Sequence, residues 1–510
     1  MSAVRRAALA ALLALFAAPG FAGAPNVAPP PAPRPDRAGP DALTLVAEAE
    51  LSGRVAYIVV DLETGAPLEG GDIDLPLPPA SVAKVATALF ALDTLGPDHR
   101  FETRLVALGP LDENGVLNGD LVLQGGGDPE TDTHTLDLLA FRAAEAGLKK
   151  VEGQFLVDDK LLPAIERIDA TQPEIAGYNP AVGALNLNYN RVFAEWRRKG
   201  GNEVMNVEAR ANTLSPPTEA VRVEIVDATT SGAVFDYLGA ADAGGPEIWR
   251  VARGALGASG GRWLPVRRPG PYAGEVMRGR AAEAGIALSP PTMGAAPIVP
   301  DVLARVESRS LADILADMLK YSTNLTAETV GMAATRAVGG SADSLAASAA
   351  SMNAWAAGFA GFAPGAPDFR LVNFSGLSPD SRVSARRLVE LLVAAEKRGF
   401  PALDGGRAAK LKGLLPQRRY LDEGTTPPPV EASVRAKTGT LNFVSALAGY
   451  IEPDHGRRLA FAIITADLAA RDAIVDKEIE IPSGARAWAG RSRALQRALI
   501  RSWITRFAAP

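Results

Sequence analysis

A serine and a lysine one helical turn apart are the first residues in this chain whose types and spacing could carry out chemistry. In "PPASVAKVATALFAL", Ser81 precedes Lys84 by three positions within a small, apolar stretch. Apolar residues recur there at helical spacing, which predicts a helix that ends before Gly96, at Val82, Val85, Leu89 and Leu92. Ser81 and Lys84 therefore share a helix face. Taken alone, the pair also fits a surface lysine beside a helix-capping serine.

The chemistry that such a pair can support is activation of the serine by the lysine. A serine hydroxyl is a weak nucleophile and needs a base within hydrogen-bond reach. A lysine can be that base when it is neutral, and both burial and a second cation lower its pKa. Ser81 is therefore the candidate nucleophile, and Lys84 the candidate base. No histidine has a setting that suggests a serine–histidine pair, and we expect all three at the surface: His99, His134 and His455.

Two further motifs strengthen the case for a site built around Ser81. "YSTNLTAE" contains Ser322 and Asn324 directly after a stretch with a helical pattern. "AKTGTLNFVSALAGY" contains Lys437-Thr438-Gly439-Thr440 at the start of an expected strand. Each motif alone also fits a turn at the end of an element. Together they form an S-x-x-K, S-x-N and K-T-G set, expected on a helix, a helix–helix junction and a strand.

These motif residues suit the steps of acyl transfer. Ser322 can relay a proton from the lysine to a leaving amine, and Asn324 can hold a substrate amide carbonyl. Lys437 can act as the second cation near Lys84, and with Thr438 it can bind a substrate carboxylate. Gly439 would leave room for a substrate chain beside the strand. The backbone N–H groups of Ser81 and Thr440 would form the oxyanion hole.

Composition and the N-terminus narrow the class of protein. The chain has 510 residues, 47% hydrophobic content, a net charge of −5 and no cysteine. These values favour a globular protein held together by its core alone and argue against nucleic-acid binding. Residues 1–22 have the basic start, short apolar run and small residues of a cleavable signal peptide, and residues 23–40 form a proline-rich linker. We therefore expect export to the periplasm, the retained N-terminal anchor being the alternative.

Changes in the predicted secondary structure along the sequence divide the mature chain into domains. Residues 41–100 and 303–510 contain a predicted hairpin, the helices and the C-terminal strands, and are expected to form one discontinuous catalytic domain. Residues 101–302 alternate short β-like runs with Gly- and Pro-rich turns, which predicts an inserted, strand-rich domain. A smaller domain is expected to be nested in it at roughly 190–270. The fold class predicted for the whole chain is α/β (α+β).

The order and spacing of the three motifs resemble those of the class C, low-molecular-mass penicillin-binding proteins, the D-alanyl-D-alanine carboxypeptidase/endopeptidases. The insert between the first two motifs is a hallmark of that family, and "GALNLNYNR" and "NFSGLSPDSRVSA" fit as well. The resemblance implies a five-stranded antiparallel sheet between helices, and peptidoglycan stem peptides as substrates. It further implies an acyl-enzyme on Ser81, β-lactams as covalent inhibitors, and no metal or organic cofactor.

The resemblance also implies an acidic residue of the insert that contacts the diaminopimelate side chain, and by position in "GQFLVDDKLL" the candidate is Asp158. An ordinary turn residue after a strand is the alternative, and Lys160 stands where the family more often has serine. The loop Asn373–Leu377 departs from the family pattern at its first two residues, so we expect an altered shape at the cleft edge. Two rival functions remain, a β-lactamase and a non-catalytic peptidoglycan-binding scaffold.

The last helical stretch carries an apolar stripe and six arginines in "RAWAGRSRALQRALIRSWITRF". Loose membrane association through a basic amphipathic helix is one interpretation. Packing of the stripe on the domain's own sheet is the favoured one, through Leu495, Leu499, Trp503 and Phe507. The oligomeric state is not predicted.

Overall fold

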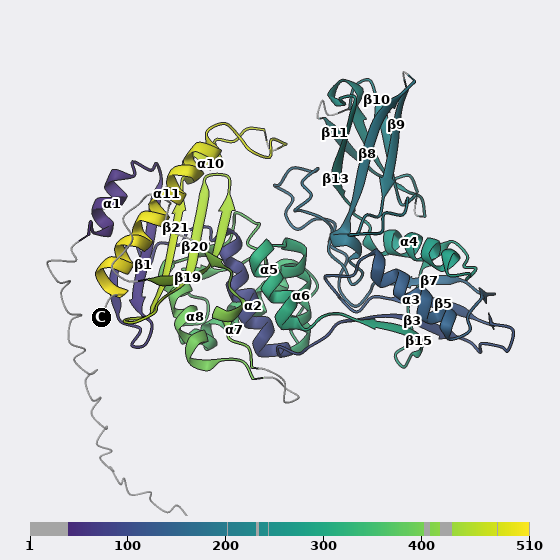
Figure 1. Cartoon of the computed structure of the whole chain (residues 1–510), viewed down its shortest axis with the longest axis horizontal. Coiled ribbons are helices and arrows are strands. Elements are labelled where there is room, and N and C mark those ends of the chain that lie inside the picture. Colours follow the sequence, from purple (N-terminus) through teal and green to yellow (C-terminus); the bar gives the residue numbers. More distant parts are fainter. Residues whose placement is uncertain are drawn as a thin grey trace, which may run out of the picture.

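The structure is a computed structural model that describes residues 39–510, except 201, 231–233, 243, 402–407, 419–430, 477 and 509–510. The predicted signal peptide, and all but the last two residues of the predicted linker, lie outside the described residues. The architecture is a mixed α/β fold, as predicted. Figure 1 shows a sheet-and-helix body on one side and an inserted unit on the other.

The body is built on one sheet in which every neighbouring pair of strands is antiparallel. Its order is β18 (Gln417–Arg418), β19 (Ala432–Leu441), β20 (Val444–Pro453), β21 (Leu459–Ala466), β1 (Arg54–Asp61) and β2 (Pro67–Gly71). The sheet has six strands rather than the expected five. The additional one is β18, a two-residue edge strand that is too short to leave a sequence pattern.

The two faces of this sheet bury different sets of side chains, because successive residues of a strand point to opposite sides. In β20, Leu447 and Ile451 join one core, whereas Ala448 and Tyr450 join the other. The first core is closed by α1 (Ala42–Glu48) and α11 (Ala485–Trp503), which cross one face of the sheet in Figure 1. The second is closed by helices that include α2 (Lys84–Leu95), α5 (Leu311–Tyr321), α6 (Asn324–Ala337), α7 (Leu345–Ala360) and α8 (Ala385–Arg398).

The apolar stripe of the C-terminal helix packs on the sheet, which confirms the favoured interpretation. Leu495, Leu499 and Trp503 are buried in the same core as Tyr57 and Phe461. The Trp503 ring lies 5.9 Å from the Phe461 ring and 6.5 Å from the Tyr57 ring, centre to centre. Within the described residues, no helix combines the length and the apolar character needed to cross a membrane.

The insert leaves and rejoins the body through two neighbouring strands. These are β3 (Glu102–Leu108) and β15 (Asp301–Glu307), which pair antiparallel. They form one edge of a five-stranded mixed sheet that continues with β5 (Asp120–Gln124), β7 (Phe155–Asp158) and β14 (Pro291–Met293). The expectation of a strand-rich insert missed two helices that pack in its core, α3 (Thr133–Glu145) and α4 (Pro269–Glu283). The sequence of each helix contains a signal for its N-terminus. Asp132 makes a capping box at the start of α3, and α4 begins with a proline.

Two three-stranded sheets lie beyond α4. One contains β13 (Ser259–Pro265), β8 (Arg191–Lys199) and β9 (Asn202–Glu208), and the other β10 (Val221–Val226), β12 (Glu247–Ala252) and β11 (Phe235–Ala240). Figure 1 shows them projecting away from the five-stranded sheet. The division of the chain into three domains at the predicted boundaries stays a prediction.

Candidate active site

The nucleophile sits in a strained turn directly before a helix. Ser81 belongs to a 3-10 turn, Ala80–Ala83, and Lys84 is the first residue of α2, so the α-helix itself begins after Ser81. Ala80 is fully buried with a φ of 47°, a left-handed conformation that costs an L-residue roughly 1–2 kcal/mol. Gly376 packs so closely on this turn that a Cβ there would overlap the Ala80 carbonyl. The surrounding backbone therefore holds Ser81 in a fixed position.

Lys84 makes three hydrogen bonds that define how it can act. Its Nζ lies 3.0 Å from Ser81 Oγ, 2.7 Å from Asn324 Oδ1 and 2.9 Å from the Ser375 carbonyl oxygen. The two carbonyl oxygens can only accept, whereas the hydroxyl can also donate. A neutral Lys84 therefore gives its two N–H groups to the carbonyls and turns its lone pair toward Ser81. This is the arrangement that a general base requires.

The S-x-N motif occupies the junction between α5 and α6. Ser322 ends α5 in a left-handed conformation with a φ of 62°, and its N–H donates to the Met318 carbonyl. Asn324 then begins α6, and its Nδ2 donates to the Tyr178 carbonyl, 2.9 Å away in the insert. The Asn324 side chain thus links Lys84 to the insert, while Ser322 faces the second lysine.

The K-T-G motif lies on β19, against the nucleophile turn. Lys437 Nζ donates to Ser322 Oγ and to the Thr438 carbonyl, each at 2.9 Å. Among the described residues these are its hydrogen-bond partners, so one of its three N–H groups is left for a ligand. Thr438 is half-buried and Thr440 is exposed. The four side chains of Ser81, Lys84, Ser322 and Lys437 therefore gather at one place.

Gly439 has a structural use in addition to the predicted one, which stays a prediction. A Cβ at this position would lie 2.6 Å from the Pro79 carbonyl oxygen and 3.0 Å from the Ser81 nitrogen. The missing side chain thus makes room for the protein's own nucleophile turn, rather than only for a substrate. It also brings β19 next to the Ser81 N–H, one of the two donors expected in the oxyanion hole.

The electrostatics of the site favour a neutral Lys84. Burial lowers the pKa of this fully buried lysine well below its usual value, the nearby Lys437 cation lowers it further, and the Glu328 carboxylate opposes both. Burial also lowers the pKa of Lys437, to about 7, with a contribution from the Arg418 cation. The Lys437 cation therefore helps to keep Lys84 neutral, as the sequence predicted.

One contributor to the site that the sequence did not predict is a buried glutamate. Glu328 is fully buried in α6 and accepts hydrogen bonds from the N–H groups of Phe374 and Ser375, both at 2.9 Å. These bonds hold the loop whose Ser375 carbonyl receives Lys84. Burial raises the pKa of Glu328. A signal existed, since a glutamate four residues after Asn324 lies on the same helix face.

The expectation about the loop Asn373–Leu377 was wrong in its location. All five residues are buried beneath the nucleophile turn rather than exposed at the cleft edge. Asn373 Oδ1 accepts from the Gly376 N–H at 3.0 Å, which closes the loop internally. The two departures from the family pattern therefore fall in the floor of the site.

Asp158 is engaged within the insert. It ends β7, and its carboxylate accepts from the Ala296 N–H at 2.9 Å, the Lys160 N–H at 3.2 Å and Gln124 Nε2 at 3.4 Å. The side chain is buried. These bonds fit the alternative role of Asp158 as a turn residue after a strand. A contact between Asp158 and the substrate stays a prediction.

The histidines have packing or surface environments. His99 is half-buried rather than exposed, and its ring meets Phe101 edge-on at 4.8 Å. His134 is also half-buried and lies 3.1 Å from the Thr213 hydroxyl, whereas His455 is exposed. Among the described residues, none of the three hydrogen-bonds to Ser81.

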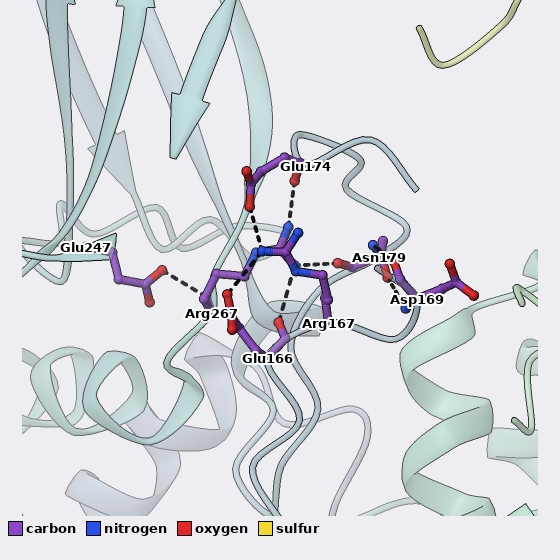
Figure 2. Close-up of polar contacts among 7 residues, drawn as sticks. All are labelled: Glu166, Arg167, Asp169, Glu174, Asn179, Glu247 and Arg267. Atoms are coloured by element: carbon purple, nitrogen blue, oxygen red, sulfur yellow. Dashed lines mark hydrogen bonds and ion pairs between the residues drawn. The ribbon is translucent and has the colours of Figure 1, made fainter. Parts of the chain in front are cut away.

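A buried arginine of the insert shapes the loop that reaches Asn324 (Figure 2). Arg267 donates to the backbone carbonyls of Asn179 and Glu174, each at 2.6 Å, and of Glu166 at 3.3 Å. Its own N–H donates to the Glu247 carboxylate at 2.9 Å, which ties the loop to β12. Figure 2 also shows two further pairs along the loop, Arg167 with Glu174 and Asp169 with Asn179. The insert is thus braced next to Tyr178, whose carbonyl receives the Asn324 amide.

Comparison with known proteins agrees with this geometry. A model of the D-Ala-D-Ala carboxypeptidase 3 (S13) family matches residues 42–485. The chain belongs to this family of serine peptidases. Among its relatives, the D-alanyl-D-alanine carboxypeptidase of Actinomadura sp. (strain R39) is 28% identical over 493 residues, which cover 88% of this chain and 86% of the relative. The D-alanyl-D-alanine carboxypeptidase DacB of Haemophilus influenzae is 25% identical, over 75% of this chain and 79% of the relative.

Solved structures of a penicillin-binding protein share this fold. The crystal structure of penicillin-binding protein 4 from Haemophilus influenzae has a TM-score of 0.70 and 21% identity, covering 90% of this chain and 99% of that one. A second structure of that protein, complexed with a β-lactam, has a TM-score of 0.66 and 22% identity.

Proposed function

We propose that this protein is a serine-type D-Ala-D-Ala carboxypeptidase and D,D-endopeptidase that acts on peptidoglycan stem peptides through an acyl-enzyme on Ser81. The observation that carries the proposal is the contact of a fully buried lysine of lowered pKa with the Ser81 hydroxyl at 3.0 Å. Family membership and the names of the relatives support the substrate class.

In the acylation step, Ser81 Oγ attacks the carbonyl carbon of the penultimate D-Ala, and neutral Lys84 takes the hydroxyl proton. The carbonyl oxygen becomes an oxyanion that the N–H groups of Ser81 and Thr440 stabilise. The bond to the leaving amine then breaks as Ser322 gives its proton to the amine nitrogen and regains one from Lys84, which becomes neutral again. Water afterwards hydrolyses the ester and restores the Ser81 hydroxyl.

Substrate binding uses the other motif residues. Lys437, which retains one N–H group for a ligand among the described residues, binds the carboxylate of the leaving residue together with Thr438. Asn324 positions the substrate's amide. A β-lactam presents a carbonyl and a carboxylate at similar separation, so we propose that it acylates the same serine. The N-terminal residues 1–22 support export to the periplasm, where this substrate lies.

The deciding experiment is digestion of purified muropeptides, monomeric and cross-linked, with mass analysis of the products. Wild type should release D-Ala or cleave cross-links and should be labelled by a fluorescent penicillin, and Ser81→Ala should do neither. Ser341→Ala, at an exposed serine of the body, is the matched control and should behave as wild type.

The two rivals give other results. A β-lactamase would turn over nitrocefin rapidly without lasting label and leave muropeptides intact. A non-catalytic scaffold would bind peptidoglycan, yet a fluorescent penicillin would fail to label even the wild type.

A further inference from the structure

A groove runs from the S-x-N motif into the insert. A cavity of about 170 Å³ is bounded by Ser322 to Asn324 on the body side and by Tyr178 on the insert side. A larger cavity of about 690 Å³ lies within the insert. Tyr189 and Arg191 line both cavities, so the two cavities adjoin, and together they are called the groove.

The backbone that presents Tyr189 and Arg191 is strained. Asn188, Tyr189 and Asn190 all have positive φ values, 52°, 57° and 51°. Such residues persist only where their surroundings enforce them, and they cluster at functional sites. Here buried amides enforce the turn: Asn188 Nδ2 donates to Thr133 Oγ1 at 2.9 Å, and Asn190 Nδ2 donates to the Ala181 carbonyl at 2.9 Å.

Arg191 differs from the other arginines of the groove. Arg210 is paired with Glu208, and Arg309 with Glu130, both at 2.7 Å. Among the described residues no carboxylate pairs with Arg191, and its buried Nε has no hydrogen-bond partner. The guanidinium is held instead between the rings of Tyr189 and Trp263, at 5.5 Å and 5.1 Å from their centres. It is a positioned cation with unused donors, which suits a carboxylate ligand.

We propose that this groove binds the leaving-group side of a cross-linked substrate, and that Arg191 binds a carboxylate of the second stem peptide. The inference rests on the proposed function and extends it. A carboxypeptidase has to release only free D-Ala, whereas an endopeptidase releases an amine that carries a whole stem peptide. Ser322, which protonates that amine, opens directly onto the groove. The bond between D-Ala and the cross-linking amine breaks, and the proton from Ser81 ends on the amine.

The test compares two substrates with one set of variants. Wild type, Arg191→Gln and Arg222→Gln are assayed on a monomeric pentapeptide muropeptide and on a cross-linked dimer. Arg222 is an exposed arginine on β10, outside the groove, and serves as the matched control. Loss of one charge-assisted contact predicts a roughly 10- to 100-fold lower kcat/KM on the dimer, mainly through KM. Release of D-Ala from the monomer, penicillin labelling and the melting temperature should stay as in wild type.

A second variant guards against misfolding. Tyr189→Asn keeps a residue that tolerates the left-handed turn but removes the ring shared by both cavities. It should lower dimer cleavage more than D-Ala release from the monomer. An equal fall on both substrates, or no change on the dimer, overturns the subsite. A wild type that releases D-Ala and binds penicillin but leaves dimers intact overturns it as well, without affecting the proposed function. A wild type inactive in all three assays refutes the proposed function itself.

Discussion

Lys84 in the body and Arg191 in the insert are two basic side chains that their surroundings hold in opposite ways. In the body, each of the three positions around Lys84 Nζ is filled by another part of the chain, namely Ser81, Asn324 and Ser375. In the insert, Arg191 is fixed by two aromatic rings but has no carboxylate partner among the described residues. The catalytic machinery is thus complete before substrate arrives, whereas the groove of the insert retains donors for a ligand. The contrast supports the proposal that the body supplies the chemistry and the insert distinguishes between substrates.

The largest effect is expected from removing the lysine at the centre of the hydrogen bonds in the body. Lys84→Ala removes the base and should slow acylation by a fluorescent penicillin about 1,000-fold. Monomeric and cross-linked muropeptides should lose activity equally, because both use the same acylation step. Lys149→Ala, at an exposed lysine of the insert, is the control and should keep full activity. An active Lys84→Ala would remove the lysine from the mechanism.

The next effect tests the close approach of β19 to the nucleophile turn. Gly439→Ala places a methyl group 2.6 Å from the Pro79 carbonyl oxygen, so the turn or the strand must shift. A displacement of about 1 Å at the reacting group costs on the order of 100-fold in rate. The acylation rate should fall by that factor on both substrates. Gly413→Ala, at a glycine with open space around it, should leave the rate unchanged.

A smaller effect is expected where the insert contacts the body. Arg267→Met removes the donors that hold the loop carrying Tyr178, so Asn324 loses a well-placed partner. Acylation should slow roughly 10-fold. Hydrogen exchange of residues 166–179 should accelerate, while that of the body sheet should not. Unchanged exchange in that loop would contradict the role given to Arg267.

The smallest effect concerns pH. Lys437 must be protonated to bind a carboxylate, so kcat/KM should fall as pH rises through its pKa of about 7. Arg418→Gln removes a cation that lowers the pKa of Lys437. The alkaline limb should therefore move upward, with a several-fold gain in kcat/KM at pH 8. A downward shift, or none, would show that Arg418 does not act on this lysine.

Much of the site was predictable because its residues are fixed by local motifs. Ser81, Lys84, Ser322, Asn324 and Lys437 each stand in a short pattern whose residue types follow from the chemistry. The backbone acceptors were not predictable. The carbonyls of Ser375 and Tyr178 carry no residue-type signal, since every residue has a carbonyl and only the path of the chain brings one to Lys84 or Asn324. The buried position of Asn373–Leu377 was not predicted either, because it too depends on the path of the chain.

The sequence by itself determined the order of the motifs, the periodicity that forms the central sheet and helices, and the long insertion between Ser81 and Ser322. The tertiary structure alone decided which atoms meet. Within the site, hydrogen bonds between residues as much as 291 positions apart depend on how a sheet made from both ends of the chain packs against its helices. The direction of the Lys84 lone pair, the close contact at Gly439 and the position of the Arg191 guanidinium between two rings all follow from that packing. Geometry and burial depend on the assembled chain rather than on any one segment of it.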